Sequence, residues 1–411
     1  MFAGAVVSIQ GPFFPEVARS KGASSTESGL VFGIFEFVKF IMAPIYGKLL
    51  GGRLNMYKVL NSGIATTSIC CVTFGYLHLI QGRTAFIASS VIVRFIEAVG
   101  DSAAVTAGFA IIISEFPNAV ATTFAIMETF YGIGMIGGPV LGGCLYELGG
   151  YSFTFSTIGI LLMISACVIY YLFILNVDFS QKDKAEMSTT DNNQKNDIGI
   201  TKILMIPSIT LAAFSLFSAT SALGFINATL EHHIVDFHLN KFQIGTIFAL
   251  ECGTYALTAP CFGALCDRIK SPENVSVIGA VFIAVGFMML GPLPYFPIEK
   301  GLLVICVGML TTGIGTGAVF VSSFTIFLQS SLKNGFQDDV VTYSLASGVW
   351  TSVVSLGFFA GPLAGGILDD LIGFRCGTIF VISIQISYLV ADYSYRAYKG
   401  TSRYHHDQYK I

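Results

Sequence analysis

The sequence predicts an all-α membrane protein built from two bundles of six helices. Three observations lead to this fold class. Of the 411 residues, 54% are hydrophobic and only 11% are charged, whereas a soluble domain usually carries roughly 25% charged residues. The apolar residues form long blocks, which are typical of membrane-spanning helices, and one polar stretch divides the chain near its middle. The net charge of −3 gives no indication of nucleic-acid binding.

Twelve spans are predicted along the chain. The first, residues 1–14, ends at a turn between Pro12 and Pro15 and is too short, because about 20 residues are needed to cross a bilayer. We expect that the chain begins part-way into its first helix, since a basic leader and a small-residue cleavage site, which a signal peptide needs, are missing. The other spans are 27–50, 57–79, 85–113, 119–146, 152–176, 203–228, 242–266, 275–296, 301–328, 341–368 and 374–394.

Residues 177–202 are polar, charged and poor in aromatic residues, which predicts a flexible linker. The linker separates an N-terminal six-helix bundle (1–176) from a C-terminal one (203–395), and a tail (396–411) follows. More Lys and Arg residues lie on the linker side of the predicted spans than on the other side. The positive-inside rule then places the linker, the tail and both termini in the cytoplasm.

The two halves of the sequence repeat each other. APIYGKLL (43–50) ends the second span and APCFGALC (259–266) ends the eighth, so that Ala43 corresponds to Ala259. GGPVLGG (137–143) lies in the fifth span and AGPLAGG (360–366) in the eleventh, so that Gly137 corresponds to Ala360. Duplicated six-helix halves are typical of alternating-access transporters. No phosphate loop, redox motif or nucleophile triad is found, so we expect a transporter and no enzyme, with no catalytic residue, metal or cofactor.

The stretch GIGMIGGPVLGG (132–143) is rich in residues that disfavour a helix in water, where Gly costs about 1 kcal/mol and Pro about 3 kcal/mol relative to Ala. In lipid, small residues instead allow helix backbones to approach closely. Simple packing is one interpretation. Because the pattern recurs in the eleventh span, we predict an interface that both packs and slides. Its residues are Gly134, Gly138, Pro139, Gly142, Gly361 and Pro362.

These segments resemble the major facilitator superfamily over nearly the whole chain. GIGMIGGPVLGG resembles the antiporter motif of its fifth helix, and Arg94 in VIVRFIEAVG resembles its fourth-helix arginine. GALCDR, with Gly263, Asp267 and Arg268, resembles its loop signature and here follows the eighth helix. The resemblance implies the fold of that superfamily. Gly51 stands in the first half at the place of Asp267, so that half lacks the carboxylate of the usual charge latch.

Within the superfamily, residues 117–155 are similar to the vesicular amine transporter family, specifically its polyamine branch, and so are PFFPEVARSKG (12–22) and GLVFGIFEFV (29–38). The resemblance implies exchange of protons for organic cations in a secretory-vesicle or other endomembrane, with the plasma membrane as an alternative. Polyamines such as spermidine and spermine are favoured over monoamines, because the acidic residues of monoamine carriers are missing from the first, tenth and eleventh spans. A facilitator for a sugar, organic anion or drug, and a receptor or scaffold, are the other functions considered. We expect a monomer.

Charged residues inside the predicted spans are candidate site residues, because a charge at the bilayer centre costs about 3 kcal/mol and has to be paired, protonated or facing water. Arg94, Glu97 and Asp101 share one face of the fourth span at i, i+3 and i+7. Arg94 and Glu97 form either a structural ion pair or a gated network that a proton or substrate opens. Asp101 lies nearer the cytoplasmic end, and a place at the channel mouth is the alternative for it. Acids outnumber bases in the spans, which favours a cationic substrate.

Glu128 lies about nine residues, or roughly 13 Å of helix rise, into the fifth span. With Tyr131 it offers an organic amine a carboxylate and a π-face. A protonated Glu128 bonded to a neighbouring helix is the alternative. Glu36 lies at a similar depth from the other side, with Lys39 one turn away to neutralise it.

Glu251 is a weaker candidate for the same role. We predict that Glu128 and Glu36 bind opposite ends of an elongated polycation, with Tyr131, Tyr255 and Trp350 as wall residues. Burial disfavours the charged form of a carboxyl group and a nearby cation favours it. A proton and the substrate therefore compete for the same carboxyl groups, and this competition would produce exchange.

Overall fold

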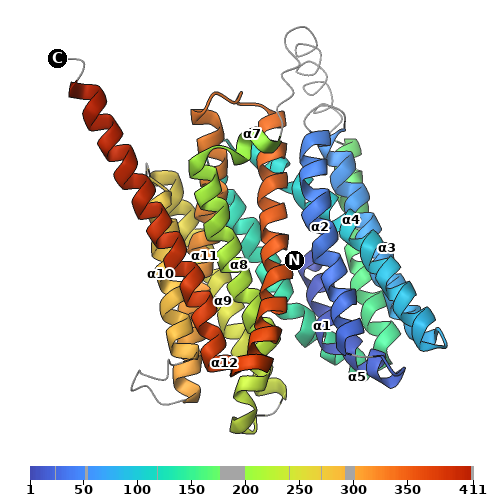
Figure 1. Cartoon of the computed structure of the whole chain (residues 1–411). Helices are drawn as coiled ribbons and strands as arrows, with labels where there is room; N and C mark the ends of the chain where they lie inside the picture. Colours follow the sequence, from blue (N-terminus) through green and yellow to red (C-terminus); the bar gives the residue numbers. More distant parts are fainter. Residues whose placement is uncertain are drawn as a thin grey trace. The chain divides into compact units, whose positions relative to one another are not determined.

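The structure, a computed structural model, describes residues 1–23, 25–50, 54–117, 119–175, 200–239, 241–269, 271–291 and 301–408. These residues form helices and short connections, and no strand occurs among them (Figure 1). Eight stretches of them are long and apolar enough to cross a membrane. The predicted all-α membrane fold is therefore confirmed.

The helices follow the predicted spans closely. In chain order they are α1 (Phe2–Ser20), α2 (Ser25–Leu50), α3 (Met56–Tyr76), η1 (Leu77–Leu79), α4 (Arg83–Glu115), α5 (Val120–Leu175), α7 (Ile200–Leu204), α8 (Pro207–Ile234), η3 (Val235–Phe237), α9 (Lys241–Arg268), α10 (Glu273–Leu290), α11 (Leu302–Lys333) and α12 (Val340–Gln408). Residues 292–296, the end of the ninth predicted span, lie outside the described residues.

The helix α1 corrects the prediction for the first span. Its backbone is helical through the stretch from Pro12 to Pro15 and ends at Ser20, so the turn expected there is wrong. Inside a bilayer a segment has to satisfy its own backbone hydrogen bonds, which favours a continued helix over an open turn. The helix thereby reaches 19 residues, close to the length of about 20 residues that a span requires.

Two long helices, α5 and α12, each carry two of the predicted spans, and a glycine separates the two spans in both. Gly150 has a φ of 74° and Gly373 a φ of 76°, a backbone conformation that residues with a side chain rarely adopt. The register that aligns GGPVLGG with AGPLAGG also aligns Gly150 with Gly373. The internal repeat therefore extends from the motifs to the backbone.

The described chain divides into two compact units. Unit 1 consists of Met1–Glu115, Gly134–Met205 and Gln337–Ser352, and unit 2 consists of Phe116–Ile133, Ile206–Phe336 and Val353–Ile411. Each sequence half therefore contributes one segment to the unit formed mainly by the other half. Most of the predicted linker, residues 177–199, lies outside the described residues, as do residues 409–411 of the tail. The domain boundaries at the linker stay a prediction.

The glycine-rich stretch of α5 lies against α1 in unit 1. A Cβ added at Gly138 would lie 2.9 Å from the Ala5 carbonyl oxygen, and one at Gly142 would lie 3.0 Å from Ile9 Cγ1. A Cβ added at Gly134 would lie still closer to its neighbour, the carbonyl group of Met1. Real Cβ atoms do not approach other atoms so closely, so the small residues at these positions permit the helix packing that the sequence predicts.

The corresponding stretch of α12 makes the same kind of contact with α8 in unit 2. A Cβ added at Gly361 would lie 2.9 Å from Ser221 Cα, and one at Gly224 would lie 3.2 Å from Pro362 Cγ. The side chain of Pro139 lies outside the described residues. Close packing of both glycine-rich stretches is thus observed, and sliding at these interfaces stays a prediction.

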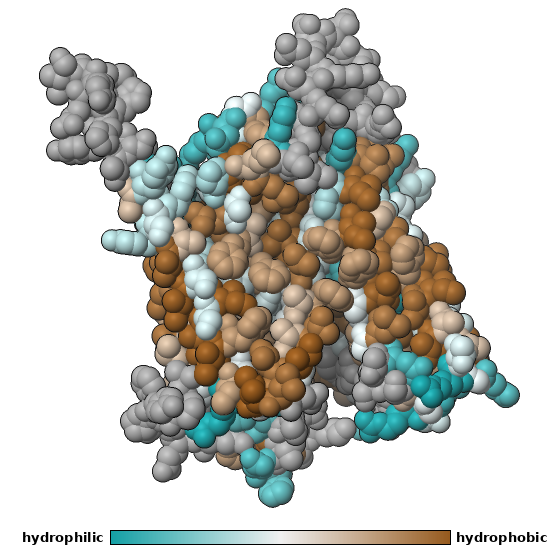
Figure 2. Space-filling view, viewed as in Figure 1, coloured by the Kyte–Doolittle hydropathy of each residue, from teal (hydrophilic) through white to brown (hydrophobic). Residues whose placement is uncertain are grey.

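Large hydrophobic side chains are exposed along the helices. Figure 2 shows hydrophobic residues along the helices and hydrophilic ones towards helix ends on the face that it displays. Leu257 on α9 is 78% exposed and Val390 on α12 is 59% exposed. In water, such apolar surface marks an interaction site. On helices of this length and hydropathy, we interpret it as lipid-facing surface.

Candidate functional site

The face of α4 that carries Arg94 is buried in unit 1. Arg94 Nη1 lies 3.0 Å from Glu97 Oε2, and the side chains are 3% and 0% exposed. Gln10 on α1 donates from Nε2 to both carboxylate oxygens of Glu97, over 2.9 and 3.1 Å. The predicted ion pair is therefore present, and Gln10 is a partner that sequence reasoning missed. Gln10 was missed because the candidates were chosen by charge. Its polar side chain inside an apolar span is the signal that could have indicated it.

A second buried ion pair lies one turn further along α4. Lys39 Nζ on α2 lies 2.8 Å from Asp101 Oδ2, and the side chains are 9% and 2% exposed. Lys39 therefore binds Asp101, and the interpretation that it neutralises Glu36 is wrong. Asp101 is buried as the partner of Lys39. The ring of Phe35 lies beside both cations, and its centroid is 4.0 Å from Arg94 Cζ and 5.0 Å from Lys39 Nζ. Both distances suit cation–π contacts.

Glu36 is half-buried on α2 in unit 1. Its Oε2 atom is inaccessible and has no hydrogen-bond partner within the described part of the chain. A buried carboxyl oxygen without a partner costs free energy. A ligand with an ammonium group, or a proton, would remove that cost.

Glu128 is 7% exposed in unit 2 and accepts a hydrogen bond from the Tyr255 hydroxyl on α9. The next residue, Thr129, donates from its hydroxyl to the Ala256 carbonyl over 2.9 Å. These bonds bind the first part of α5 to α9. A bond from Glu128 to a neighbouring helix belongs to the alternative interpretation of this residue, and here Tyr255 is the donor. Tyr131 is half-buried one turn further along α5.

Glu251 is also buried in unit 2, with 6% exposure. The adjacent Cys252 thiol donates a weak hydrogen bond to its Oε2 over 3.5 Å, and no charged partner is found in the part of the chain that the structure describes. The predicted wall residue Trp350 belongs to unit 1, where it packs edge-to-face against Phe109 at 5.3 Å. The structure thus brings together Arg94, Glu97, Lys39 and Asp101 in unit 1, and Glu128 and Tyr255 in unit 2.

The loop signature caps the start of α5 within unit 2. Asp267 Oδ1 accepts from the Ala121 amide over 3.1 Å, and its Oδ2 accepts from the Thr122 amide over 2.9 Å and from the Thr122 hydroxyl over 2.6 Å. A carboxylate at this position satisfies amides that have no partner within the helix and interacts favourably with the helix dipole. Gly263, one turn earlier, permits the approach, because an added Cβ would lie 2.8 Å from the Ala121 carbonyl oxygen. Arg268 is exposed at the end of α9.

The start of α12 is capped differently, in unit 1. The Thr342 amide donates to Asp339 Oδ1 over 2.9 Å, so α12 carries its own capping carboxylate. Residue 51, where the sequence has Gly at the place of Asp267, lies outside the described residues.

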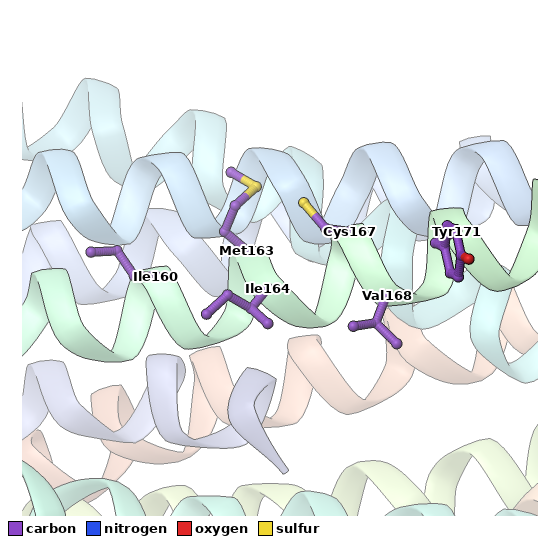
Figure 3. Close-up of a pocket in the computed structure, with 6 residues that line it drawn as sticks. All are labelled: Ile160, Met163, Ile164, Cys167, Val168 and Tyr171. Atoms are coloured by element: carbon purple, nitrogen blue, oxygen red, sulfur yellow. The ribbon is translucent and has the colours of Figure 1, made fainter.

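A groove of about 340 Å³ lies on the second part of α5 and offers no charged group (Figure 3). Its lining residues come from one helix and are Ile160, Met163, Ile164, Cys167, Val168 and Tyr171. Apart from the Tyr171 hydroxyl and a thiol, these side chains are apolar. This surface suits lipid chains and offers no carboxyl group to a cation.

The chain is similar to known transporters over most of its length. The model of the Major Facilitator Superfamily matches residues 1–341 and 212–399. The chain is 32% identical over 372 residues to the MFS-type transporter SLC18B1 of Mus musculus. The aligned residues cover 90% of this chain and 78% of that relative. It is 21% identical over 356 residues to the synaptic vesicular amine transporter of Homo sapiens, which covers 85% of this chain and 63% of the relative.

A solved structure shows the same fold. The crystal structure of the human organic anion transporter MFSD10 (TETRAN) superposes with a TM-score of 0.64 at 17% identity, covering 95% of this chain and 97% of that chain. At this level of identity the similarity supports the fold alone.

Proposed function

We propose that this chain, which belongs to the major facilitator superfamily, exchanges protons for organic cations across a membrane, with polyamines such as spermidine and spermine as the cargo. It is a multi-pass membrane transporter, and its relationship to the vesicular amine transporters is confirmed by its relatives. The name of the synaptic vesicular amine transporter supports an amine cargo. We further propose a monomer in an endomembrane, with the linker and both termini in the cytoplasm.

The observation that carries the proposal is the distribution of charge inside the helices. Both cations of the predicted spans, Arg94 and Lys39, are bound to carboxylates of α4. Two further acids, Glu36 and Glu251, have no charged partner among the residues that the structure describes, and Glu128 accepts from a neutral hydroxyl. Buried carboxyl groups of this kind suit a cationic cargo better than an anionic one.

Exchange follows from competition at these carboxyl groups. A buried carboxylate is costly, and either a proton or an ammonium group can neutralise it. A carrier that alternates between the two sides of the membrane would then bind cargo where protons are scarce and release it where protons are abundant. Glu36 in unit 1 and Glu128 in unit 2 are each proposed as a ligand for an ammonium group of the cargo.

Uptake into proteoliposomes tests the proposal. We expect labelled spermidine to accumulate in vesicles with an acidic lumen, and Glu128→Gln to abolish this uptake while keeping the shape of the side chain. Glu147→Gln is the matched control, because it makes the same substitution at an exposed position of the same helix. Proton-driven uptake at the normal rate in Glu128→Gln would refute the role of the carboxylate. Uptake of serotonin or glucose in place of spermidine would identify a monoamine carrier or a facilitator.

A further inference from the structure

One hydrogen bond occurs in equivalent form in both units. In unit 2 the Thr129 hydroxyl donates to the Ala256 carbonyl over 2.9 Å, and in unit 1 the Ser352 hydroxyl donates to the Phe40 carbonyl over 2.7 Å. The donors Thr129 and Ser352 occupy equivalent positions when GGPVLGG is aligned with AGPLAGG. The acceptors Phe40 and Ala256 occupy equivalent positions when APIYGKLL is aligned with APCFGALC. The same contact therefore binds the start of α5 to α9 and the start of α12 to α2.

The adjacent pair of residues differs between the units. In unit 2, Glu128 on α5 accepts from Tyr255 on α9. In the same two alignments, Thr351 stands at the position of Glu128 and Lys39 at the position of Tyr255, both in unit 1. Lys39 is bound to Asp101 on α4. Unit 2 therefore has a titratable carboxyl group beside the shared contact, where unit 1 has a threonine hydroxyl.

The position of Tyr255 is closely defined by its surroundings. Its side chain is 9% exposed, and its ring packs against Phe320 on α11 with the centroids 5.6 Å apart. Gly132 on α5 lies beside the ring, since a Cβ added there would be at ordinary contact distance, 3.4 Å, from Tyr255 Cε1. A tyrosine packed in this way presents its hydroxyl to Glu128 at little further entropic cost.

We propose that Tyr255 is a positioning residue that couples the occupancy of Glu128 to the contact between α5 and α9. While Glu128 is ionised and without cargo, the Tyr255 hydroxyl holds it, and with it the first part of α5, on α9. A proton or an organic ammonium group at Glu128 weakens this hold and releases α5. The inference rests on the proposed function, because it makes the cargo-binding carboxyl group part of a contact that opens during transport.

The chemistry of the hydrogen bond supplies the switch. A hydrogen bond to an ionised carboxylate is roughly twice as strong as one between neutral groups, and a low dielectric strengthens it further. Protonation makes the acceptor neutral, and an ammonium group competes for the same oxygen lone pairs. We expect either event to shift the equilibrium between held and released α5 about tenfold, because the additional strength of a hydrogen bond to an ionised carboxylate is then lost.

Among the described residues, Glu251 is a second buried carboxyl group of α9 and lies one turn from Tyr255. The titratable groups that act on Tyr255 besides Glu128 are Tyr131 on α5 and Cys252 on α9. The helix α11 presents aromatic rings, Phe320 to Tyr255 and Phe324 to the first part of α5. Glu128 is the carboxyl group that Tyr255 contacts, so a change of its charge acts directly on the hydrogen bond.

The reactivity of Cys266 with a maleimide reports the release of α5. Cys266 is 0% exposed and lies between Gly263 and Asp267, which both contact the start of α5. The full chain would be reconstituted in liposomes, and labelling of Cys266 measured by mass spectrometry at neutral and acidic pH, with and without spermidine. We expect acid and spermidine each to raise the labelling rate of Cys266 in the unmodified chain about tenfold relative to the rate of a free cysteine at the same pH, because acid by itself slows maleimide addition by lowering the thiolate fraction.

Two variants separate positioning from simple stability. Tyr255→Phe keeps the ring and removes the donor, so Cys266 should react about tenfold faster at neutral pH, with little further response to acid or spermidine. Glu128→Gln should do the same, because it keeps a neutral acceptor. Tyr388→Phe is the matched control: it removes another buried tyrosine hydroxyl of unit 2, which donates to Ser276, and should leave labelling unchanged.

The outcomes distinguish this inference from the proposed function. Labelling of Tyr255→Phe at the unmodified rate, or equal acceleration in Tyr388→Phe, overturns the inference even if spermidine is carried. Acceleration in Tyr255→Phe and in acid, combined with no transport of spermidine and no response to it, supports the coupling and overturns the cargo assignment.

Discussion

Removing the Arg94 side chain should destabilise the protein far more than removing an exposed arginine. Arg94 and Glu97 are 3% and 0% exposed and lie 3.0 Å apart, so Arg94→Gln leaves a carboxylate in the interior of unit 1 without its cation. Breaking a buried pair in this way costs about 3–5 kcal/mol of unfolding free energy. The guanidinium also leaves the Phe35 ring, 4.0 Å away, which adds roughly 1–2 kcal/mol.

The control for this prediction is Arg83→Gln. Arg83 pairs with Glu27 over 2.8 Å, but its side chain is 51% exposed and that of Glu27 31%. Water screens such a pair, so its loss should cost only about 0–1 kcal/mol. Thermal unfolding of the purified chain in detergent, followed by tryptophan and tyrosine fluorescence, would compare the two variants with the unmodified protein.

A double variant identifies the cause of the loss. Arg94→Gln combined with Glu97→Gln leaves no unpaired charge at these two positions, and Gln10 can still bond residue 97, so the double variant should be roughly 2 kcal/mol more stable than Arg94→Gln. Acidic buffer should also reduce the loss in Arg94→Gln, because a proton can neutralise the stranded carboxylate. The reasoning fails if Arg94→Gln unfolds at the same temperature as Arg83→Gln, or if the second substitution lowers stability further.

Two further predictions concern helix contacts. Gly361→Ala should lower the unfolding temperature by an amount that corresponds to about 1–3 kcal/mol, because its Cβ would lie 2.9 Å from Ser221 Cα. Gly366→Ala on the same helix, where nothing lies within 4 Å, should not; equal effects would contradict the packing argument. Asp267→Asn should accelerate hydrogen exchange at the Thr122 amide, consistent with a loss of about 0.5–1 kcal/mol of capping free energy that shrinks in high salt. Unchanged exchange there would show that the cap contributes nothing.

The sequence predicts the architecture well because membrane helices and their repeat leave strong local signals. Long apolar blocks predict the helices, and the two pairs of motifs predict which positions of the two halves correspond. The same correspondence relates Gly150 to Gly373 and the bond of Thr129 to that of Ser352. A repeat recognised from two short motifs thus extends to contacts that no motif contains.

The partners of the charged residues could be predicted only in part. Arg94 and Glu97 lie on one helix, where spacing alone brings them together. Lys39 has Glu36 on its own helix and Asp101 on α4 as possible partners, and the rotation of α2 against α4 decides between them. Spacing within one helix carries no information on that rotation.

The bond between Tyr255 and Glu128 shows the same limit. The chemistry of Tyr255 predicts a wall residue, and its role as the donor to Glu128 emerges only from the packing of α5 on α9. The prediction for the end of α1 is wrong for another reason: two prolines favour a turn in water, where exposed carbonyl groups find solvent, but the helix continues where they cannot.

The division of the chain into units has a consequence for biosynthesis. Phe116–Ile133 belongs to unit 2 together with Ile206–Phe336, so the ribosome completes this segment before it has made the helices that receive it. Conversely, Gln337–Ser352 reaches unit 1 only after the rest of that unit has been synthesised. Neither unit can therefore complete its core during translation of its own half, and final packing has to await release of almost the entire polypeptide.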